Sequence, residues 1–172
     1  NYKNMSKIGI FYGSSTGYTA NVANKIAEAL GVPVADVHDV ANASPSQLGD
    51  YDVLLLGSST WGNGELQENW ADFIDGAEAL YLKGKKIAIF GCGDETMADT
   101  FDNAMGIIYK RMKKTGAEFI APFNAEGYHF HHSGANVDGK YVGLVLDEVN
   151  HPELTDARIA VWVAEIAKAC AE

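Results

Sequence analysis

Hydroxyl side chains and a glycine gather in one short segment near the start of the chain: Ser14, Ser15, Thr16, Gly17, Tyr18 and Thr19. The segment follows an apolar run and precedes residues with helical spacing. Hydroxyls and free backbone N–H groups at a helix N-terminus can bind an anion, and the helix dipole strengthens that binding. The loop lacks the lysine of a P-loop and the glycine spacing of G-x-G-x-x-G. It therefore favours a phosphate monoester held by neutral donors, with a simple Ser/Thr helix cap as the alternative.

A second segment places an aromatic residue among small and polar ones. Trp61 lies between Thr60 and the sequence Gly62-Asn63-Gly64, just after the apolar run of residues 53–58. A tryptophan flanked in this way is poorly placed for a core and well placed to stack on a flat ligand. Packing of the indole against its own loop is the alternative. Together the two segments indicate a phosphorylated, aromatic cofactor.

The elements that position these segments follow a strand–helix rhythm. Strands are expected at residues 7–12, 34–40, 53–58, 86–91 and 118–122, and helices at residues 19–30, 69–77, 101–112 and 159–170. This alternation predicts a doubly wound parallel sheet with helices on both faces, whose ligands bind beyond the carboxyl ends of the strands. The loops of residues 13–19, 58–64 and 91–100 follow such ends. Residues 123–141 interrupt the rhythm and are expected to split the last strand in two.

Composition narrows the class of protein. The chain has 172 residues, of which 47% are hydrophobic, enough for one core, and residues 7–172 are expected to form a single domain. Residues 1–6 hold Met5, typical of a natural start, and are expected to lie outside the fold. With 13 basic and 23 acidic residues the formal charge is −10, which argues against nucleic acid or anionic lipid as partners. The chain shows no signal peptide and no membrane-spanning run, so a cytoplasmic monomer with free thiols at Cys92 and Cys170 is expected.

At these residues the sequence resembles a flavodoxin of the long-chain type, from Lys7 to near the C-terminus. The segments that carry the resemblance are residues 14–19, Thr60-Trp61 with Gly64-Glu65-Leu66-Gln67, residues 90–94, residues 103–106, residues 126–128 and residues 143–148. The resemblance implies a five-stranded parallel sheet in the order 2-1-3-4-5, with the insertion splitting the fifth strand.

The resemblance also implies a function. The protein would be a low-potential one-electron carrier with tightly bound, non-covalent FMN that moves between semiquinone and hydroquinone. It would pass electrons between larger redox proteins with basic docking surfaces and would turn over no substrate of its own. The alternative on the same fold is an NAD(P)H:quinone reductase, which would usually need extra length for a nicotinamide site and oligomer contacts.

The resemblance assigns roles by motif match. The phosphate would be held by Ser14, Ser15, Thr16, Gly17, Tyr18 and Thr19. One flavin face and its N5 edge would be lined by Thr60, Trp61, Gly62, Asn63 and Gly64. The pyrimidine end would be approached by Gly93, Asp94 and Asp102, and the ribityl chain by Asp147.

Two positions stand apart from the family pattern. Residues 94–99 hold no aromatic residue where many members place a stacking tyrosine, so Met97 is expected on the second flavin face, through contact of its sulfur with the ring. An open face, or one covered by Tyr128, is the alternative. Gly62 follows Trp61, and because glycine adopts positive φ at little cost, the peptide there is expected to turn over easily on reduction.

Two further clusters of polar residues remain, one of histidines and one of acids. His129, His131 and His132 lack a cysteine or carboxylate to complete a ligand set, so no metal is expected. Acidic side chains gather near the second and third loops, where a partner-docking role and a merely solvated surface are equally favoured; they are Glu65, Glu68, Asp72, Asp94, Glu95 and Asp99. Their charge is expected to make an anionic reduced flavin less favourable.

Overall fold

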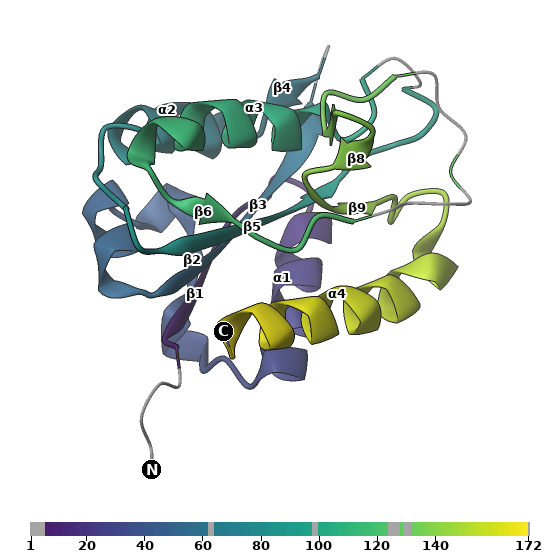
Figure 1. Cartoon of the computed structure of the whole chain (residues 1–172). Helices are drawn as coiled ribbons and strands as arrows, with labels where there is room; N and C mark the ends of the chain where they lie inside the picture. Colours follow the sequence, from purple (N-terminus) through teal and green to yellow (C-terminus); the bar gives the residue numbers. More distant parts are fainter. Residues whose placement is uncertain (1–5, 62–63, 98–99, 124–127, 129–131, 172) are drawn as a thin grey trace.

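A parallel sheet forms the centre of the molecule (Figure 1). The computed structural model describes residues 6–61, 64–97, 100–123, 128 and 132–171. The central strands are β1 (Ile8–Gly13), β3 (Val53–Trp61) and β5 (Lys86–Cys92), and their register places Ile10 beside Leu55 and Leu55 beside Ala88. Leu54, Leu55 and Leu56 are fully buried. Such continuous apolar runs are typical of parallel strands covered on both faces.

The two edges of the sheet complete the predicted order. On one edge β2 (Val37–Asp39) pairs with β1. On the other, β6 (Glu118–Phe119) pairs with the start of β5, and β9 (Gly143–Leu146) pairs with its end. Both pieces therefore occupy the fifth position, which confirms the strand order and the split fifth strand. Between them lies a small hairpin of β7 (Asn136–Val137) and β8 (Lys140–Tyr141).

Among the described residues, α-helices cover the two faces of the sheet in pairs (Figure 1). Helices α1 (Tyr18–Leu30) and α4 (Thr155–Cys170) lie on one face, and α2 (Glu68–Ala77) and α3 (Asn103–Met112) lie on the other. Each helix buries an apolar stripe, as the three-four spacing predicts.

A buried tryptophan anchors the core on each face. Trp162 of α4 packs with Phe90 and donates its indole N–H to the Ala121 carbonyl at 2.9 Å. Trp70 of α2 donates to the Gly57 carbonyl at 2.7 Å. Both indoles are fully buried, and each satisfies its one polar group while it fills the core.

Two predicted boundaries move for local reasons. The strand expected at residues 34–40 is reduced to β2, because 3₁₀ turns at Val34–Asp36 and Val40–Asn42 flank it. The Asp39 carboxylate accepts the Ala41 N–H at 2.9 Å and so caps the second of these turns.

Two further boundaries move at the carboxyl edge of the sheet. Strand β3 runs past residue 58 to Trp61, because β4 (Glu65–Leu66) folds back and pairs with its end. Helix α3 begins at Asn103 rather than residue 101, because Asp102 adopts a left-handed backbone conformation with φ of 49°.

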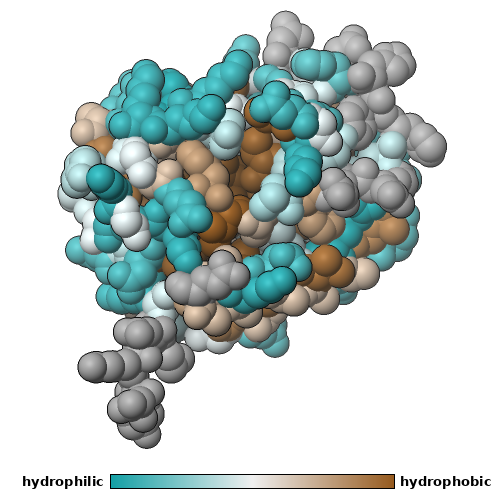
Figure 2. Space-filling model, viewed as in Figure 1, coloured by the Kyte–Doolittle hydropathy of each residue, from teal (hydrophilic) through white to brown (hydrophobic). Residues whose placement is uncertain are grey.

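The outer surface is mainly hydrophilic, but this view contains a hollow in which apolar side chains are exposed (Figure 2). At the split edge of the sheet, a cavity of about 220 Å³ lies between β6 and β8, and Tyr109, Phe119 and Tyr141 are among its lining residues. In the part of the chain that the structure describes, no helix has the length and apolar character needed to cross a bilayer.

Candidate functional site

A cavity of about 310 Å³ opens at the carboxyl ends of β3 and β5, where the fold class predicts a ligand. It brings together residues from the first, second and third loops and from the segment after β9. Its lining residues are Thr16, Tyr18, Ser59, Thr60, Trp61, Cys92, Gly93, Asp94, Met97, Glu148 and Val149.

The first loop joins β1 to α1 and has the geometry of an anion site. Gly17 precedes the helix with φ of 94°, a conformation that favours glycine, and its N–H is 3.2 Å from the Ser14 hydroxyl that accepts it. Ser15 and Thr16 are exposed, whereas Thr19 is buried. The first turn of α1 presents N–H groups that have no acceptor within the helix. These donors and hydroxyls together suit a phosphate group.

A buried glutamine fastens the first loop to the second. Gln67 is fully buried at the start of α2, and its side-chain amide donates to the Ser15 hydroxyl at 3.0 Å. Its carbonyl oxygen accepts the Asn69 N–H at 3.0 Å, while its own backbone N–H donates to the Ser58 hydroxyl. Gln67 therefore sets the separation of the two loops, a role that sequence reasoning did not assign.

The second loop carries the stacking candidate at the tip of β3. Trp61 is 40% exposed and lines the cavity, and its indole N–H donates to the Ser59 hydroxyl at 2.7 Å. The Thr60 hydroxyl accepts the Ala104 N–H at 3.0 Å and so caps helix α3. Gly64, with φ of 88°, accepts a hydrogen bond from the Asn103 amide at 2.8 Å. The predicted residues Gly62 and Asn63 lie outside the described residues.

The third loop follows β5 and packs closely on the start of α3. The Gly93 N–H donates to the Leu146 carbonyl at 2.9 Å, and a Cβ at Gly93 would lie 2.9 Å from the Asp102 nitrogen. A larger residue at Gly93 would have to displace backbone. Asp94 and Met97 line the cavity, and Met97 is 50% exposed.

The two residues considered for the second ring face, Met97 and Tyr128, lie in different surroundings. Met97 lines the cavity, whereas the Tyr128 ring packs on Phe101 at 5.2 Å and on His151 at 5.7 Å between ring centres. Val149, 52% exposed, also lines the cavity and could share that face. Met97 therefore lies at the cavity, and its place on one face of a bound ring stays a prediction.

Asp102 is placed behind the cavity rather than in its lining. It is fully buried, and neither carboxyl oxygen accepts a hydrogen bond of normal geometry from the described residues. Burial, with the nearby charge of Asp147, raises the pKa of Asp102 well above its usual range. A neutral carboxyl is favoured there, directly against the backbone of the third loop.

Asp147 is also fully buried, and its oxygens are occupied by protein donors. One oxygen accepts the backbone N–H groups of Val149 and Asn150, at 3.0 and 2.8 Å. The other accepts the Glu95 N–H at 2.9 Å and the Asn150 side-chain amide at 2.8 Å. The structure therefore places Asp147 in a network that joins loops, while the neighbouring Glu148 lines the cavity.

Four lining residues were given no site role from the sequence: Ser59, Cys92, Glu148 and the Val149 described above. Glu148 stands in the same motif as Asp147 but accepts the Thr155 hydroxyl at 3.1 Å and reaches the cavity wall. Cys92 lies at the floor, where burial, followed by the charge of Asp102, raises the pKa of its thiol well above the usual value. A buried, neutral thiol acts as a small packing residue, and Cys92 is a free cysteine as the sequence analysis expects. Ser59 belongs to the second loop, and its contact with Trp61 was not visible in the sequence.

The lining combines three kinds of group that together fit one class of ligand. Thr16 and Tyr18 come from the first loop and the start of α1, Trp61 and Met97 provide flat or apolar surface, and Asp94 and Glu148 add acceptors. This combination suits a molecule with a phosphate and a planar ring. The described residues contain no group of three or more His, Cys, Asp or Glu side chains able to hold a metal ion; His129 and His131 lie outside them.

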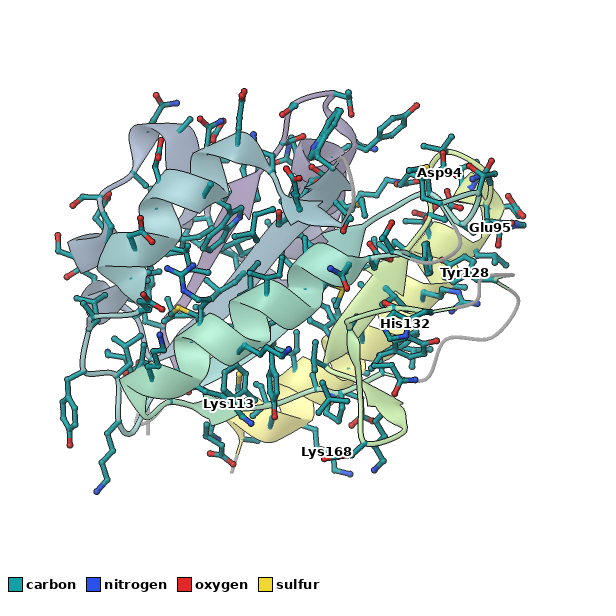
Figure 3. The ribbon with its side chains drawn as sticks, turned by 90° about the horizontal axis from the view of Figure 1, so that it is seen from above. Asp94, Glu95, Lys113, Tyr128, His132 and Lys168 are labelled. Carbon is teal, nitrogen blue, oxygen red and sulfur yellow. The ribbon has the colours of Figure 1, made fainter. Side chains whose placement is uncertain are left out.

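Charge is distributed unevenly around this site. Asp94 and Glu95 lie at the same end of the molecule as Tyr128, whereas Lys113 and Lys168 lie away from that end (Figure 3). Two carboxylates, Asp94 and Glu148, line the cavity itself, so negative charge on a ligand would be opposed there.

Comparison with known proteins agrees with this site. A family model described as Flavodoxin matches residues 10–162. The chain is 45% identical over 166 residues to Flavodoxin 1 of Escherichia coli K12, covering 95% of this chain and 94% of that protein. It is 40% identical over 164 residues to a flavodoxin of Synechococcus elongatus, covering 94% and 96%. A crystal structure of Fusobacterium nucleatum flavodoxin bound to flavin mononucleotide superposes with a TM-score of 0.88 at 28% identity, covering 96% of this chain and 99% of that one.

Proposed function

This chain belongs to the flavodoxin family, whose members are FMN-dependent electron carriers rather than enzymes, and we propose that its FMN lies in the cavity at the ends of β3 and β5. FMN, when bound, supplies two successive one-electron steps. The chain supplies the binding site and the electrostatic surroundings that tune those steps.

One observation carries the placement of the cofactor. Trp61 is half-exposed, anchored through Ser59, and lines the same cavity as Thr16 of the first loop and Met97 of the third. An indole in this position presents its face to a planar ring while the first loop receives a phosphate. The first loop as a whole would hold the phosphate, and Met97 would contact the other side of the ring. Gly93 and Asp94 would meet the ring edge.

The acidic border supports a proposal about potential and partners. Asp94 lines the cavity and Glu65 is exposed beside Trp61, so added negative charge on the cofactor would be opposed by Coulomb repulsion. A low potential follows for the second electron. The same charge, with the net −10, would favour redox proteins with basic surfaces as partners. A monomeric state, the cytoplasm and the long-chain subtype stay predictions.

A titration of the purified chain with FMN tests the proposal. We expect one FMN per chain, quenched flavin fluorescence through stacking on Trp61, and two separate one-electron potentials, the second low. Sustained NADPH:quinone turnover by the pure chain would instead support the reductase alternative. A chain that refuses FMN would contradict both functions.

A further inference from the structure

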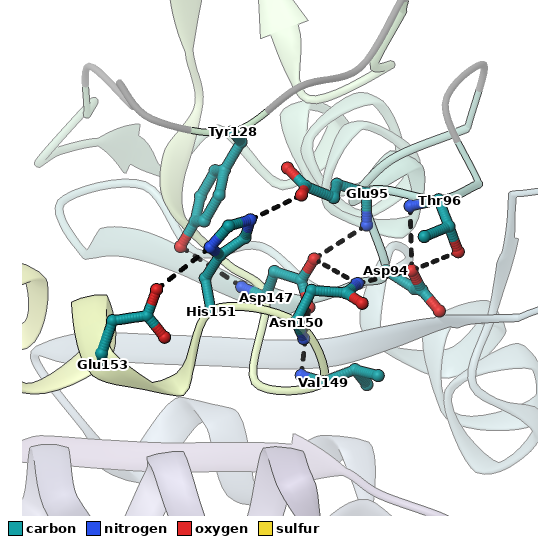
Figure 4. A network of polar contacts seen from close by, with 9 residues as sticks. All are labelled: Asp94, Glu95, Thr96, Tyr128, Asp147, Val149, Asn150, His151 and Glu153. Carbon is teal, nitrogen blue, oxygen red and sulfur yellow. Dashed lines mark hydrogen bonds and ion pairs between the residues drawn. The ribbon is translucent and has the colours of Figure 1, made fainter.

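His151 stands at the junction of two loops that border the proposed FMN site. Its Nε2 atom lies 2.5 Å from a carboxylate oxygen of Glu95 in the third loop, and its Nδ1 atom lies 3.1 Å from one of Glu153 (Figure 4). The ring is therefore placed between two acids that come from different segments of the chain. Its side chain is 23% exposed, so water reaches it.

The segment that carries His151 is itself held firmly. The His151 N–H donates to the Asp147 carbonyl at 3.0 Å, and the Asp147 carboxylate accepts the N–H groups of Val149 and Asn150. We name residues 147–151 the 147–151 turn. Pro152 follows and begins a short 3₁₀ turn. The turn therefore offers a fixed base from which His151 can hold a neighbouring loop.

The third loop meets this base at several points. Glu95 donates its N–H to Asp147, and the Asn150 amide donates to the Asp94 carboxylate at 2.7 Å. The His151–Glu95 contact is the one among these that involves a titratable ring. Met97, two residues further along, lines the cavity, so the position of the loop affects what the cofactor meets.

The protonation state of His151 determines how many carboxylates the imidazole ring can donate to. A neutral ring has one N–H and can donate to one carboxylate, while its other nitrogen then directs a lone pair at the second. An imidazolium donates from both nitrogens and satisfies Glu95 and Glu153 together. Accordingly, hydrogen bonds to these two acids raise the pKa of His151 above its ordinary value of 6.5.

Other described groups around the ring do not replace this contact. The Tyr128 ring lies 5.7 Å from the imidazole centre, and the Arg158 guanidinium lies 4.4 Å from the Tyr128 ring centre. Asp147 reaches His151 through its backbone carbonyl. The carboxylates of Glu95 and Glu153 are thus the charged groups that hold the ring nitrogens.

We propose that His151 is a positioning residue that fastens the third flavin loop to the 147–151 turn and loosens it when the ring loses its proton. This inference rests on the proposed FMN site. Below the titration the imidazolium holds Glu95 and offsets one negative charge. Above it, the neutral ring has a single N–H for the two acids, so the contact with Glu95 loses its charge assistance and weakens, and the border of the site becomes one charge more negative. FMN should then be held less tightly and its reduction should become less favourable.

The first test follows the loop without the cofactor. The protection factor of the Glu95 amide against hydrogen exchange is measured by NMR on the full chain, without FMN, from acidic to alkaline pH. We expect it to fall about fivefold through the His151 titration, about the difference between a charge-assisted hydrogen bond and a neutral one. His151→Gln should remove the step and keep protection low throughout.

Two further variants separate this role from a merely structural one. Glu153→Gln leaves the Glu95 contact in place, so it should keep the step and move its midpoint to lower pH. His38→Gln is the matched control, because His38 is hydrogen-bonded to Tyr51 at 2.7 Å beside β2, and it should leave the Glu95 step unchanged. A step that survives His151→Gln, or a midpoint that Glu153→Gln does not move, would overturn the proposal.

The second test uses the FMN-loaded protein. The FMN dissociation constant of the unaltered chain should rise across the same pH window, and that of His151→Gln should not. A Glu95 step without any change in FMN affinity would overturn the link to the cofactor. If the chain bound no FMN at all, the proposed function would fail, while the exchange measurements would still judge the contact.

Discussion

The amino and carboxyl ends of the parallel strands lie at opposite ends of the sheet, here called the amino edge and the carboxyl edge. These two ends are built in opposite ways. At the amino edge, charged side chains meet partners. Arg111 of α3 contacts Asp75 in the last turn of α2 and Glu78 directly after that helix, and Lys114 lies 3.1 Å from Glu78. Lys86 at the start of β5 donates to the Ala169 carbonyl at 2.6 Å. At the carboxyl edge, Trp61 and Met97 are left half-exposed and the buried Asp102 carboxyl has no normal hydrogen bond from the described residues.

The direction of the chain explains the difference. In a strand–helix–strand unit each helix begins at the carboxyl edge, so its free N–H groups and the positive end of its dipole face that edge. The opposite edge receives helix C-termini, whose carbonyl groups favour cations, and Arg111 and Lys168 lie in such last turns. At the amino edge the charged groups can therefore be satisfied within the protein, and we call it the closed edge. The carboxyl edge can bind an anion and a flat ring, and we call it the open edge.

The largest expected effect is a loss of FMN affinity when the aromatic residue of the open edge is removed. Trp61→Ala should weaken FMN binding by about 1–3 kcal/mol, which is about fivefold to 150-fold, because stacking on one indole contributes about that much. The dissociation constant from fluorescence titration is the measurement. Tyr81→Ala removes another exposed aromatic, 80% exposed, and is the control that should bind FMN normally. Equal affinity in both variants would remove Trp61 from the site.

The next effect concerns the buried acid behind that edge. Because the pKa of Asp102 is raised in the folded chain, folding favours its protonated form, and its ionisation lowers stability as pH rises from about 4 through the folded pKa. Asp102→Asn should therefore stabilise the FMN-free protein at pH 7 by about 1–2 kcal/mol and flatten this pH dependence. Urea denaturation at several pH values measures both. A less stable variant with an unchanged slope would mean that the carboxylate is ionised and well paired.

A smaller change in FMN affinity is expected from a substitution in the third loop, and it tests whether Met97 contacts the ring. Met97→Tyr should tighten binding of oxidised FMN by about 0.5–1.5 kcal/mol, about twofold to tenfold, because an aromatic ring adds stacking area that a thioether lacks. Isothermal titration gives the affinity. The matched change Val149→Tyr distinguishes the two candidates for that face, since both side chains line the cavity. Unchanged affinity and potentials in Met97→Tyr would exclude Met97 from the stacking position.

The smallest expected effect lies at the closed edge. There the stabilising contact is lost as pH falls, whereas the His151 contact weakens as pH rises. Hydrogen bonds from Arg111 and then Lys114 lower the pKa of Glu78 to about 2, so their stabilising contribution is present above its ordinary value and is lost as pH falls towards 2. Arg111→Met should lower the Tm by a few degrees at neutral pH, and the difference should vanish near pH 2. FMN affinity should stay the same. A loss of FMN affinity would show that the two edges are coupled.

Much of the architecture was available from local patterns. Val22, Ile26, Trp162 and Ile166 stand at helical spacing, and the leucines of β3 form a run that only a doubly covered strand accommodates. These patterns reflect which side chains must leave water, a property of each segment by itself. The insertion could be located because it interrupts that rhythm.

The first two loops were also recognisable, because Ser14–Gly17 and Trp61 are residue types that a core seldom places after a buried strand. Boundaries were less accessible. The extension of β3 depends on β4 pairing with it, and the start of α3 depends on the left-handed backbone at Asp102, which no local spacing shows.

The sequence by itself determined the strand–helix order, the two apolar faces and the residue types that suit a phosphate and a planar ring. Tertiary structure alone decided which of two adjacent acids lines the cavity. Asp147 and Glu148 are neighbours in the chain, yet one is buried in a network that joins two loops and the other reaches the cavity wall. The Glu95–His151 contact likewise joins residues that are 56 positions apart. Such contacts depend on how separate segments pack, and no single segment carries that information.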